Sequence, residues 1–310
     1  MNGLVSIIAI NYNQTQVTFE MLDSMENLNY SQYEIIIVDN GSADRSIEKI
    51  RVDYPDVIFV ESVQNLGFAG GNNLGLAHAS GEFVFFTNND TEVLPGTLDP
   101  LVEKLKESDK IGMVCPKIRF HYQPDTIQFA GYTALNKITV RNNLIGYREK
   151  DTGQYDTSRK SPFGHGAAMM VKREVIQQVG TMADMYFLYY EELDWCTRIS
   201  SKGFEIWYVP DSLIYHKESI STGKMSPLKT YYITRNRILY TRRNIKGFNF
   251  FLSIIYQVII SGPKNMLQFI IKGRLDLFLA YIRGYLWHLG HLFDKNIKLN
   301  PTPYTQNKGV

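Results

Sequence analysis

Cysteine is scarce in this sequence. The 310 residues include only Cys115 and Cys196, which are far apart and lack the spacing of a metal-binding pair. This excludes a disulfide-rich secreted domain and a cysteine-based zinc site, and we expect both thiols to be reduced core residues of a cytoplasmic protein. The N-terminus lacks a basic segment followed by an apolar stretch, so no signal peptide is expected.

Two common nucleotide-binding motifs are missing as well. A strand predicted at Val5–Ile10 is followed by Asn11–Thr15, not by the glycine-rich turn of a dinucleotide site, and no P-loop pattern occurs. These absences exclude a nicotinamide or flavin dehydrogenase and a P-loop kinase or ATPase. A long hydrophobic run is also missing, because the apolar segment 248–260 is shorter than the about 20 residues that a helix needs to cross a bilayer.

The composition is that of a globular protein with an uneven charge distribution. Hydrophobic residues make up 44% and charged residues 21% of the chain, which fits one large or two small domains. The net charge is +2, but fifteen Lys and Arg against three Asp and Glu follow from Lys217 onward, so this part carries +12 and the rest −10. Aromatic residues, at 13%, suit a sugar-binding cleft, a membrane-facing surface, or both.

Apolar segments alternate with helix-like segments in the first half of the chain. Strands are predicted at Val5–Ile10, Glu34–Asp39 and Val57–Val60, and each is followed by a polar turn and a helical stretch, which is typical of a parallel α/β sheet. The run Phe83–Phe86 has no alternation and predicts a strand buried on both faces. Further strands are predicted at 162–170 and 203–210, with a short helix at 174–179 between them.

Polar residues follow the buried strand at Phe83–Phe86. Ligands bind at the carboxyl ends of strands in open α/β sheets, and Mg²⁺ is usually held by one or two carboxylates plus substrate phosphates. Asp90 is therefore a candidate metal ligand, with Asn88 beside it. The alternative is that Asn88-Asn89-Asp90 only turns the chain.

Two further stretches are candidates for chemistry. The glycine-rich segment 64–75 allows close approach of backbone to a ligand, and a helix starting near Gly71 would point its N–H groups at a phosphate or a sugar hydroxyl; the alternative is a tight connection with close helix packing. Glu191, Glu192 and Asp194 follow an aromatic stretch, so mutual repulsion and burial would raise at least one pKa and favour a general base. The alternative is an acidic helix start.

Four motifs together resemble glycosyltransferase family 2, especially its rhamnosyltransferase-like members. They are Asn11-Tyr12-Asn13, Val38 to Ser42, Asn65 to Asn72 and Asn88 to Thr91, and the resemblance runs from about Val5 to Ser221. It implies a GT-A fold, with a parallel-rich α/β sheet that binds a nucleotide diphospho-sugar. It also implies that the polar segment 120–161 covers the donor sugar and shapes the acceptor site, the alternative being a disordered insertion.

The resemblance assigns roles to individual residues. Asp39 would accept the N–H of the pyrimidine, with Asn11 and Asn13 in the same pocket, and Glu192 would be the base, oriented with the acceptor by Glu191 and Asp194. Mg²⁺ or Mn²⁺ would be held by Asp90, Asn88 and His216, although only the last carboxylate of the family's Asp-x-Asp is kept, and Ala183 stands where the family usually has Asp. The remaining substrate-binding residues would be Asn65, Gly67, Gly70, Asn72, Asn89 and Gly166.

The C-terminal third is expected to differ from the rest. We divide the chain into a catalytic domain, residues 1–222, and a basic, aromatic helical extension, residues 223–310. In the segment 275–293 the polar residues fall on one side at helical spacing, which predicts an amphipathic helix lying in an anionic membrane surface. The alternative is that the apolar faces pack on the catalytic domain or on a second copy of the chain in a homodimer.

The sequence thus predicts an inverting glycosyltransferase at the inner face of the cell membrane. Its donor would be a nucleotide sugar, dTDP-rhamnose being favoured, and its acceptor a cell-surface polysaccharide or a lipid-linked glycan; no nucleic acid is expected as a partner. Two rivals are a sugar-phosphate nucleotidyltransferase, which should carry a glycine-rich, Arg-containing turn after the first strand, and a non-catalytic scaffold that binds a nucleotide sugar.

Overall fold

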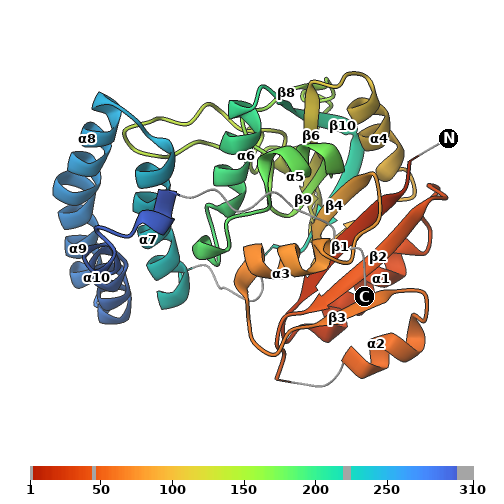
Figure 1. The fold of residues 1–310 in the computed structure, drawn as a ribbon, viewed down its shortest axis with the longest axis horizontal. Helices are drawn as coiled ribbons and strands as arrows, with labels where there is room; N and C mark the ends of the chain where they lie inside the picture. Colours follow the sequence, from red (N-terminus) through yellow and green to blue (C-terminus); the bar gives the residue numbers. More distant parts are fainter. Residues whose placement is uncertain (1–2, 44–46, 219–224, 299–310) are drawn as a thin grey trace.

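The computed structural model describes residues 3–43, 47–218 and 225–298. Helices α1 to α6 lie around a central sheet, and α8 to α10 form a separate group on one side, with α7 between them and the sheet (Figure 1). The described part of the N-terminal domain therefore has an α/β architecture with a helical extension, as predicted.

Ten strands form one mixed sheet in the described part of the chain. The main path has the order β3-β2-β1-β4-β9-β6-β10-β5, with β7 on β6 and β8 on β10. The neighbours β3, β2, β1 and β4 run parallel, whereas β9 pairs antiparallel with both β4 and β6. The strands are β1 (Val5–Asn11), β2 (Tyr33–Asp39), β3 (Ile58–Glu61), β4 (Phe83–Asn88), β5 (Thr91–Val93), β6 (Ile111–Phe120), β7 (Gln123–Phe129), β8 (Arg159–Lys160), β9 (Ala168–Lys172) and β10 (Glu205–His216).

The apolar runs form the strands of the sheet's centre. Residues Phe83 to Phe86 of β4 are buried, because β1 and β9 flank the strand and helices cover the sheet. The parallel register places Asn11 of β1 beside Asp39 of β2, and Ile10 beside Asn88 of β4. Three strands thus deliver polar residues to one edge of the sheet, where the carboxyl ends of parallel strands carry ligand sites.

Several boundaries differ from those predicted. The helix of the glycine-rich segment begins at Gly67, not near Gly71, and the strand predicted at 162–170 begins only at Ala168. The last strand continues past Pro210 to His216, because the pairing with β6 resumes after a register shift between Val209 and Leu213. A bulge of this kind accommodates a proline that cannot donate to the ladder.

The helices that surround the sheet connect its strands, and those of the extension follow β10. They are α1 (Thr15–Met25), α2 (Ile47–Asp53), α3 (Gly67–Leu76), α4 (Leu98–Lys106), α5 (Arg173–Val179), the 3-10 turn η1 (Asp184–Tyr186), α6 (Glu191–Ser201), α7 (Pro227–Asn244), α8 (Phe248–Ile255), the π-helical η2 (Tyr256–Ser261), α9 (Gly262–Ile271), α10 (Leu275–Gly290) and the 3-10 turn η3 (Lys295–Lys298).

Helix α7 connects the extension to the catalytic domain. It begins with Ser226, whose side chain caps the helix by accepting from Lys229 N, and with Pro227 at the first position. Its residues Leu239 and Tyr240 belong to the same buried core as the sheet, whereas Phe269, Leu277 and Tyr281 form a small second core between α9 and α10. No helix in the described ranges is long and apolar enough to span a membrane.

Candidate active site

A cleft of about 400 Å³ opens at the carboxyl ends of β1 and β4. Its walls come from the end of β4, the start of α3, the turn before α6 and the last residue of β10. Nine residues predicted for substrate, metal or catalysis line it together: Asn65, Gly67, Asn88, Asn89, Asp90, Gly166, Glu191, Glu192 and His216. Residues far apart in the sequence are thus gathered in one place.

Asp90 and His216 form the polar floor of the cleft. Asp90 Oδ1 lies 3.0 Å from His216 Nε2, and Asn88 Nδ2 lies 3.4 Å from the same nitrogen. On its other side, His216 Nδ1 donates to Gln128 Oε1 at 2.7 Å. Because the amide oxygen can only accept, Nδ1 carries the hydrogen of this bond and Nε2 faces Asp90, the arrangement of a ligating histidine with its outer partner.

These residues fit a hard divalent cation that also takes ligands from substrate. Asp90 Oδ1 is buried, and apart from its closeness to His216 Nε2 it has no hydrogen-bond partner among the described residues. In the described ranges no group of three His, Cys, Asp or Glu side chains could hold a metal. A cation at Asp90 and His216 would therefore need diphosphate oxygens and water to complete its shell, which is how Mg²⁺ is commonly bound.

Glu191 and Glu192 line another wall of the cleft, which is formed by the first turn of α6. Burial raises the pKa of Glu192 to about 7, and burial together with the charge of Glu192 raises the pKa of Glu191. The Oε2 atom of each side chain is buried and has no hydrogen-bond partner among the described residues. Two neighbouring carboxyl groups that each bury an oxygen do not both ionise easily, so the pair can hold and accept a proton near neutral pH.

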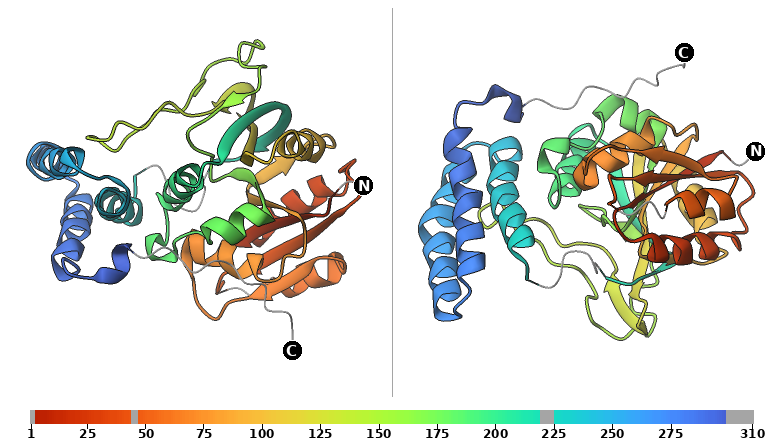
Figure 2. Two further views of the ribbon diagram at one scale, coloured as in Figure 1. Left: turned by 45° about the horizontal axis from the view of Figure 1, so that its top comes forward. Right: turned by 90° about the horizontal axis from the view of Figure 1, so that it is seen from below.

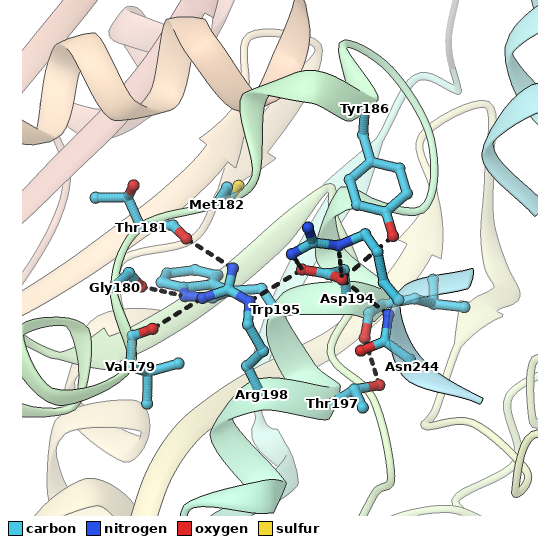
Figure 3. Close-up of polar contacts among 12 residues, drawn as sticks. Val179, Gly180, Thr181, Met182, Tyr186, Asp194, Trp195, Thr197, Arg198 and Asn244 are labelled. Atoms are coloured by element: carbon cyan, nitrogen blue, oxygen red, sulfur yellow. Dashed lines mark hydrogen bonds and ion pairs between the residues drawn. The ribbon is translucent and has the colours of Figure 1, made fainter. Parts of the chain in front are cut away.

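Asp194 lies away from the cleft, in a buried cluster of polar side chains (Figure 3). Its carboxylate accepts from Arg198 Nε at 2.9 Å, from Arg243 Nε at 2.8 Å, from Asn244 Nδ2 at 2.8 Å and from Tyr186 at 3.2 Å. Burial alone would raise the pKa of Asp194, but the two guanidinium groups lower it. The residue thus anchors α7 to α6, and no contact to Glu192 supports the predicted role in orienting the base.

The rest of that cluster fixes the chain before α6. Arg198 donates to the carbonyls of Val179 and Thr181, and Trp195 donates to that of Gly180 (Figure 3). These bonds hold the loop between α5 and η1 against α6. These contacts therefore fix the position of α6, whose first turn carries Glu191 and Glu192.

The turn between η1 and α6 has an unusual backbone. Phe187, Tyr189 and Tyr190 all have positive φ angles, of 64°, 67° and 76°. Such angles cost energy for non-glycine residues and persist only where the surroundings hold them. Asn236 of α7 donates to the carbonyls of Tyr186, Leu188 and Tyr189, at 2.9, 2.7 and 2.8 Å.

The glycine-rich segment holds the other side of this turn. Phe68 N donates to Phe187 O at 2.6 Å, and a Cβ on Gly67 would lie only 2.2 Å from that oxygen. Gly71 and Gly75 pack against Ile10 and Ile8 of β1, as expected for close packing of a helix on the sheet. Gly67, in contrast, lines the cleft, where its backbone could approach a ligand. Gly70 does not line the cleft; a Cβ there would meet Leu66.

The residues predicted to hold the nucleoside form a network beside the cleft. Asn11 Nδ2 donates to Asp39 Oδ1 at 3.0 Å, Ser42 donates to the same oxygen, and Asn13 N donates to Ser42. Asn11, Asn13 and Asp39 do not line the cleft itself, whereas their neighbours Tyr12 and Asn40 do. Asn72 is also outside the cleft, where its amide donates to Phe68 O.

Several residues of the cleft were not predicted. Tyr132 and His165 line it, and burial raises the pKa of Tyr132 and lowers that of His165 to about 3, so both are neutral. Tyr132 belongs to the segment 120–161, which forms β7, β8 and isolated bridges such as Thr126 with Lys150, and is therefore folded rather than disordered. No periodicity in that segment signals Tyr132, and Gln128 is recognisable only once His216 lies beside it.

Known proteins resemble this chain over most of its length. The family model described as "Glycosyl transferase family 2" matches residues 6–180. An N-acetylglucosaminyl-diphospho-decaprenol L-rhamnosyltransferase of Mycobacterium tuberculosis is 25% identical over 72% of this chain and 79% of its own length. The dTDP-rhamnosyl transferase RfbF of Shigella flexneri is 24% identical over 92% of this chain and 97% of its own.

A solved structure shows the same fold. The mannosyltransferase PcManGT of Pyrobaculum calidifontis, in complex with GDP-Man and Mn²⁺, superposes with a TM-score of 0.57 at 18% identity, covering 94% of this chain and 76% of that one. At this identity the likeness establishes the GT-A fold alone. Together with the family match over more than half of the chain, it shows that this chain belongs to glycosyl transferase family 2.

Proposed function

We propose that this glycosyltransferase moves rhamnose from a nucleotide diphospho-sugar to a glycan acceptor with inversion at the anomeric carbon. The observation that carries the proposal is the placement of two acidic groups in one cleft. Glu192 has a pKa near 7, and Asp90 lies beside His216 where a cation would bind. A single displacement needs a base for the acceptor hydroxyl and a positive charge for the leaving diphosphate.

Glu192 would remove the proton of the acceptor hydroxyl as that oxygen attacks the anomeric carbon. Glu191 would hold the shared proton of the pair in the resting enzyme, and Tyr132 supplies a neutral wall beside Glu192. Mg²⁺ or Mn²⁺ bound to Asp90 and His216, with Asn88 nearby, would neutralise the charge that develops on the leaving diphosphate. The network of Asn11, Asn13 and Asp39 would support the pocket of the pyrimidine through Tyr12 and Asn40.

The choice of donor and acceptor rests on the relatives. Two of them are named as rhamnosyltransferases, one for a dTDP-sugar and one for a diphospho-decaprenol acceptor. A dTDP-rhamnose donor and a lipid-linked glycan acceptor in cell-surface polysaccharide synthesis are therefore proposed for this chain. The extension, which is basic and exposes apolar side chains on α8 to α10, would bring the cleft to an anionic membrane surface.

The test is a panel of nucleotide sugars with the full-length protein. Thermal unfolding is measured with dTDP-rhamnose, UDP-, GDP- and other dTDP-sugars in the presence of Mn²⁺, because a ligand that binds the native state raises the midpoint. The proposal expects the largest shift with dTDP-rhamnose and the release of dTDP when an acceptor is added. A larger shift with another sugar, or no release of nucleoside diphosphate with any pair, contradicts it.

A further inference from the structure

A second cavity lies in the helical extension. Its volume is about 210 Å³, and its walls are formed by α7, η2, α9, α10 and by Arg141, which the loop between β7 and β8 brings to the helices. Figure 2 shows this loop reaching from the sheet toward the extension. The cavity is thus built where two parts of the molecule meet.

The charge of this cavity is of one sign. Three of its lining residues, Arg141, Lys229 and Arg237, are cations, and no lining residue is acidic. In the described part of the chain none of the three has a carboxylate within ion-pair distance. Among the described residues Arg237 donates to the hydroxyl of Tyr190, and the Lys229 ammonium lies 5.7 Å from the centroid of the Tyr189 ring, so both cations contact aromatic groups and neither faces a carboxylate. Such a cluster attracts an anion.

The other side of the cavity is apolar. Phe269 of α9 and the rings of Tyr281 and Tyr285 of α10 line it. The same helices expose large apolar side chains nearby in sequence, including Ile270 and Ile271 on α9. A ligand that suits both halves carries a phosphate group on an apolar chain, with the phosphate at the cations and the chain along the helices.

The cavity adjoins the active-site cleft. Leu228 lines the cleft and Lys229 lines the cavity, and the Tyr189 ring beside Lys229 also belongs to the cleft. Tyr190, which Arg237 holds, directly precedes Glu191 on α6. A phosphate in the cavity would therefore lie next to the turn that presents the proposed base. The wall also includes Gln257 of the π-helical segment, and segments of this kind occur often at functional sites.

We propose that this cavity binds the phosphate or diphosphate headgroup of a lipid-linked acceptor, whose apolar chain leaves over α9 and α10. The inference rests on the proposed function, since it places the group that carries the acceptor sugar beside Glu192. It adds residues to that function: Arg141 and Lys229 recognise the headgroup, and neither lines the active-site cleft.

The experiment measures binding without turnover. Isothermal titration of the full-length protein in chelator uses dodecyl phosphate below its micelle-forming concentration, dodecanol and inorganic pyrophosphate. Without metal, the carboxylates Asp90, Glu191 and Glu192 make the cleft a poor anion site, so binding reports on the cavity. Dodecyl phosphate should bind, pyrophosphate should bind at least about tenfold more weakly, and dodecanol should not bind. Equal affinity for pyrophosphate and dodecyl phosphate contradicts a lipid ligand, and binding of dodecanol alone contradicts a phosphate site.

Matched variants locate the site. Arg141→Gln combined with Lys229→Gln should weaken dodecyl phosphate by at least about tenfold, because charged hydrogen bonds to the phosphate are lost. Lys264→Gln combined with Arg283→Gln removes two exposed cations from α9 and α10 outside the cavity and should change the affinity less than twofold. Similar losses in both pairs would mean general attraction to a basic surface and would overturn the proposal. Arg141→Gln alone, at an exposed side chain, serves if the double variant unfolds at lower temperature.

The binding and transfer measurements together distinguish failure of the cavity assignment from failure of the proposed glycosyltransferase function. A protein that binds dodecyl phosphate through Arg141 and Lys229 but releases no nucleoside diphosphate with any donor and acceptor contradicts the proposed function alone. A protein that transfers sugar to an unphosphorylated acceptor but does not bind dodecyl phosphate contradicts the cavity assignment alone.

Discussion

Glu192 and Asp90 line the same cleft, but their carboxyl groups have different surroundings. Glu192 is half-buried, its Oε2 is buried without a hydrogen-bond partner, and loss of solvent raises its pKa to about 7. Asp90 lies next to His216, whose other nitrogen is held by Gln128. At the scale of single residues, one carboxyl group is suited to taking a proton and the other to holding a cation.

The pH dependence of the reaction should report Glu192. A base acts only when it is deprotonated, so kcat/KM should fall as the pH drops through about 7. Glu192→Gln should remove this limb of the profile and lower kcat by about 10²–10⁴, with donor affinity nearly unchanged, because the amide keeps the shape but accepts no proton.

Glu191→Gln is the matched comparison, since the neighbouring carboxyl group lines the same cleft. Because Glu191 holds the proton of the pair and burial is the main cause of the raised Glu192 pKa, the substitution should leave the pH limb near 7 and keep most of the activity. An active Glu192→Gln beside an inactive Glu191→Gln would mean that the base is Glu191.

Asp90→Ala should remove the effect of Mn²⁺ on nucleotide binding. A diphosphate in the cleft would lose the cation between its oxygens and the protein, so the affinity for a nucleoside diphosphate should become the same with Mn²⁺ and with chelator. Titration calorimetry measures this without turnover. Asp211→Ala, at an exposed residue of β10, is the control and should keep the wild-type ratio. Undiminished Mn²⁺ dependence in Asp90→Ala would place the cation elsewhere.

The residues of the site were predictable in part, for a physical reason. Asp90 and Glu192 stand at the ends of strongly apolar or aromatic runs, where the switch from apolar to acidic is visible in the sequence. Asp194 shares that signal, but its role depends on Arg243 and Asn244, which approach from another helix. Gln128 and Tyr132 carry no local signal, since their importance comes only from partners brought near by the fold.

At the scale of elements, the turn before α6 is constrained by contacts from two other helices. Three residues with positive φ are held by Asn236 of α7 on one side and by the start of α3 on the other. The first half of the sheet was predictable because apolar runs alternate with helices. The antiparallel strand β9 and the role of α7 were not, because both depend on pairing across long stretches of chain.

Asn236→Ala should lower both stability and kcat. The substitution removes an amide whose two N–H groups serve three backbone carbonyls, and each lost N–H donor costs about 1 kcal/mol, so the free energy of unfolding should fall by about 2 kcal/mol. Chemical denaturation and steady-state kinetics measure the two effects. Ser6→Ala, which removes a buried hydroxyl bonded to Glu34 and Gly81 at the end of β1 far from the cleft, should lower stability but leave kcat unchanged. If both variants lose the same fraction of kcat, α7 does not position the turn.

Asp194→Asn should be destabilising rather than specifically inactivating. It leaves Arg198 and Arg243 buried without their carboxylate, a change that costs about 3–5 kcal/mol in comparable cases. Urea unfolding of the variant measures this loss. A variant of wild-type stability with no activity would instead place Asp194 in the chemistry.

At the scale of the whole molecule, the extension has two different sides. Helix α7 is part of the core of the catalytic domain, whereas α8 to α10 expose many large apolar side chains, such as Phe251, Ile259 and Ile271. The boundary predicted between residues 222 and 223 therefore separates α7 from the domain that it stabilises. A chain ending at Ser221 would lose the partners of Asp194 and of the turn, so we expect it to fold poorly.

Sedimentation with anionic vesicles tests whether the exposed apolar side chains of α8 to α10 bind a membrane. Full-length protein should bind, and high salt should weaken the binding without abolishing it, because apolar burial is not screened. Replacing Phe251, Ile259 and Ile271 with Gln should remove the part of the vesicle binding that persists in high salt. Val63→Gln with Tyr122→Gln changes two exposed apolar residues of the catalytic domain and is the control. No sedimentation of the full-length protein would contradict a membrane role.

The contacts of α7 with the turn before α6 also have a consequence for the synthesis of the protein. Asn236 and Arg243, the residues that secure the segment carrying Glu192, follow it in the chain, and Arg243 also donates to the carbonyl of Ile297 near the end of the described residues. A chain grows from its N-terminus and folds domain by domain as it emerges. We therefore expect that the sheet can assemble while the turn before α6 still lacks its partners, and that the enzyme becomes competent only after α7 has been made.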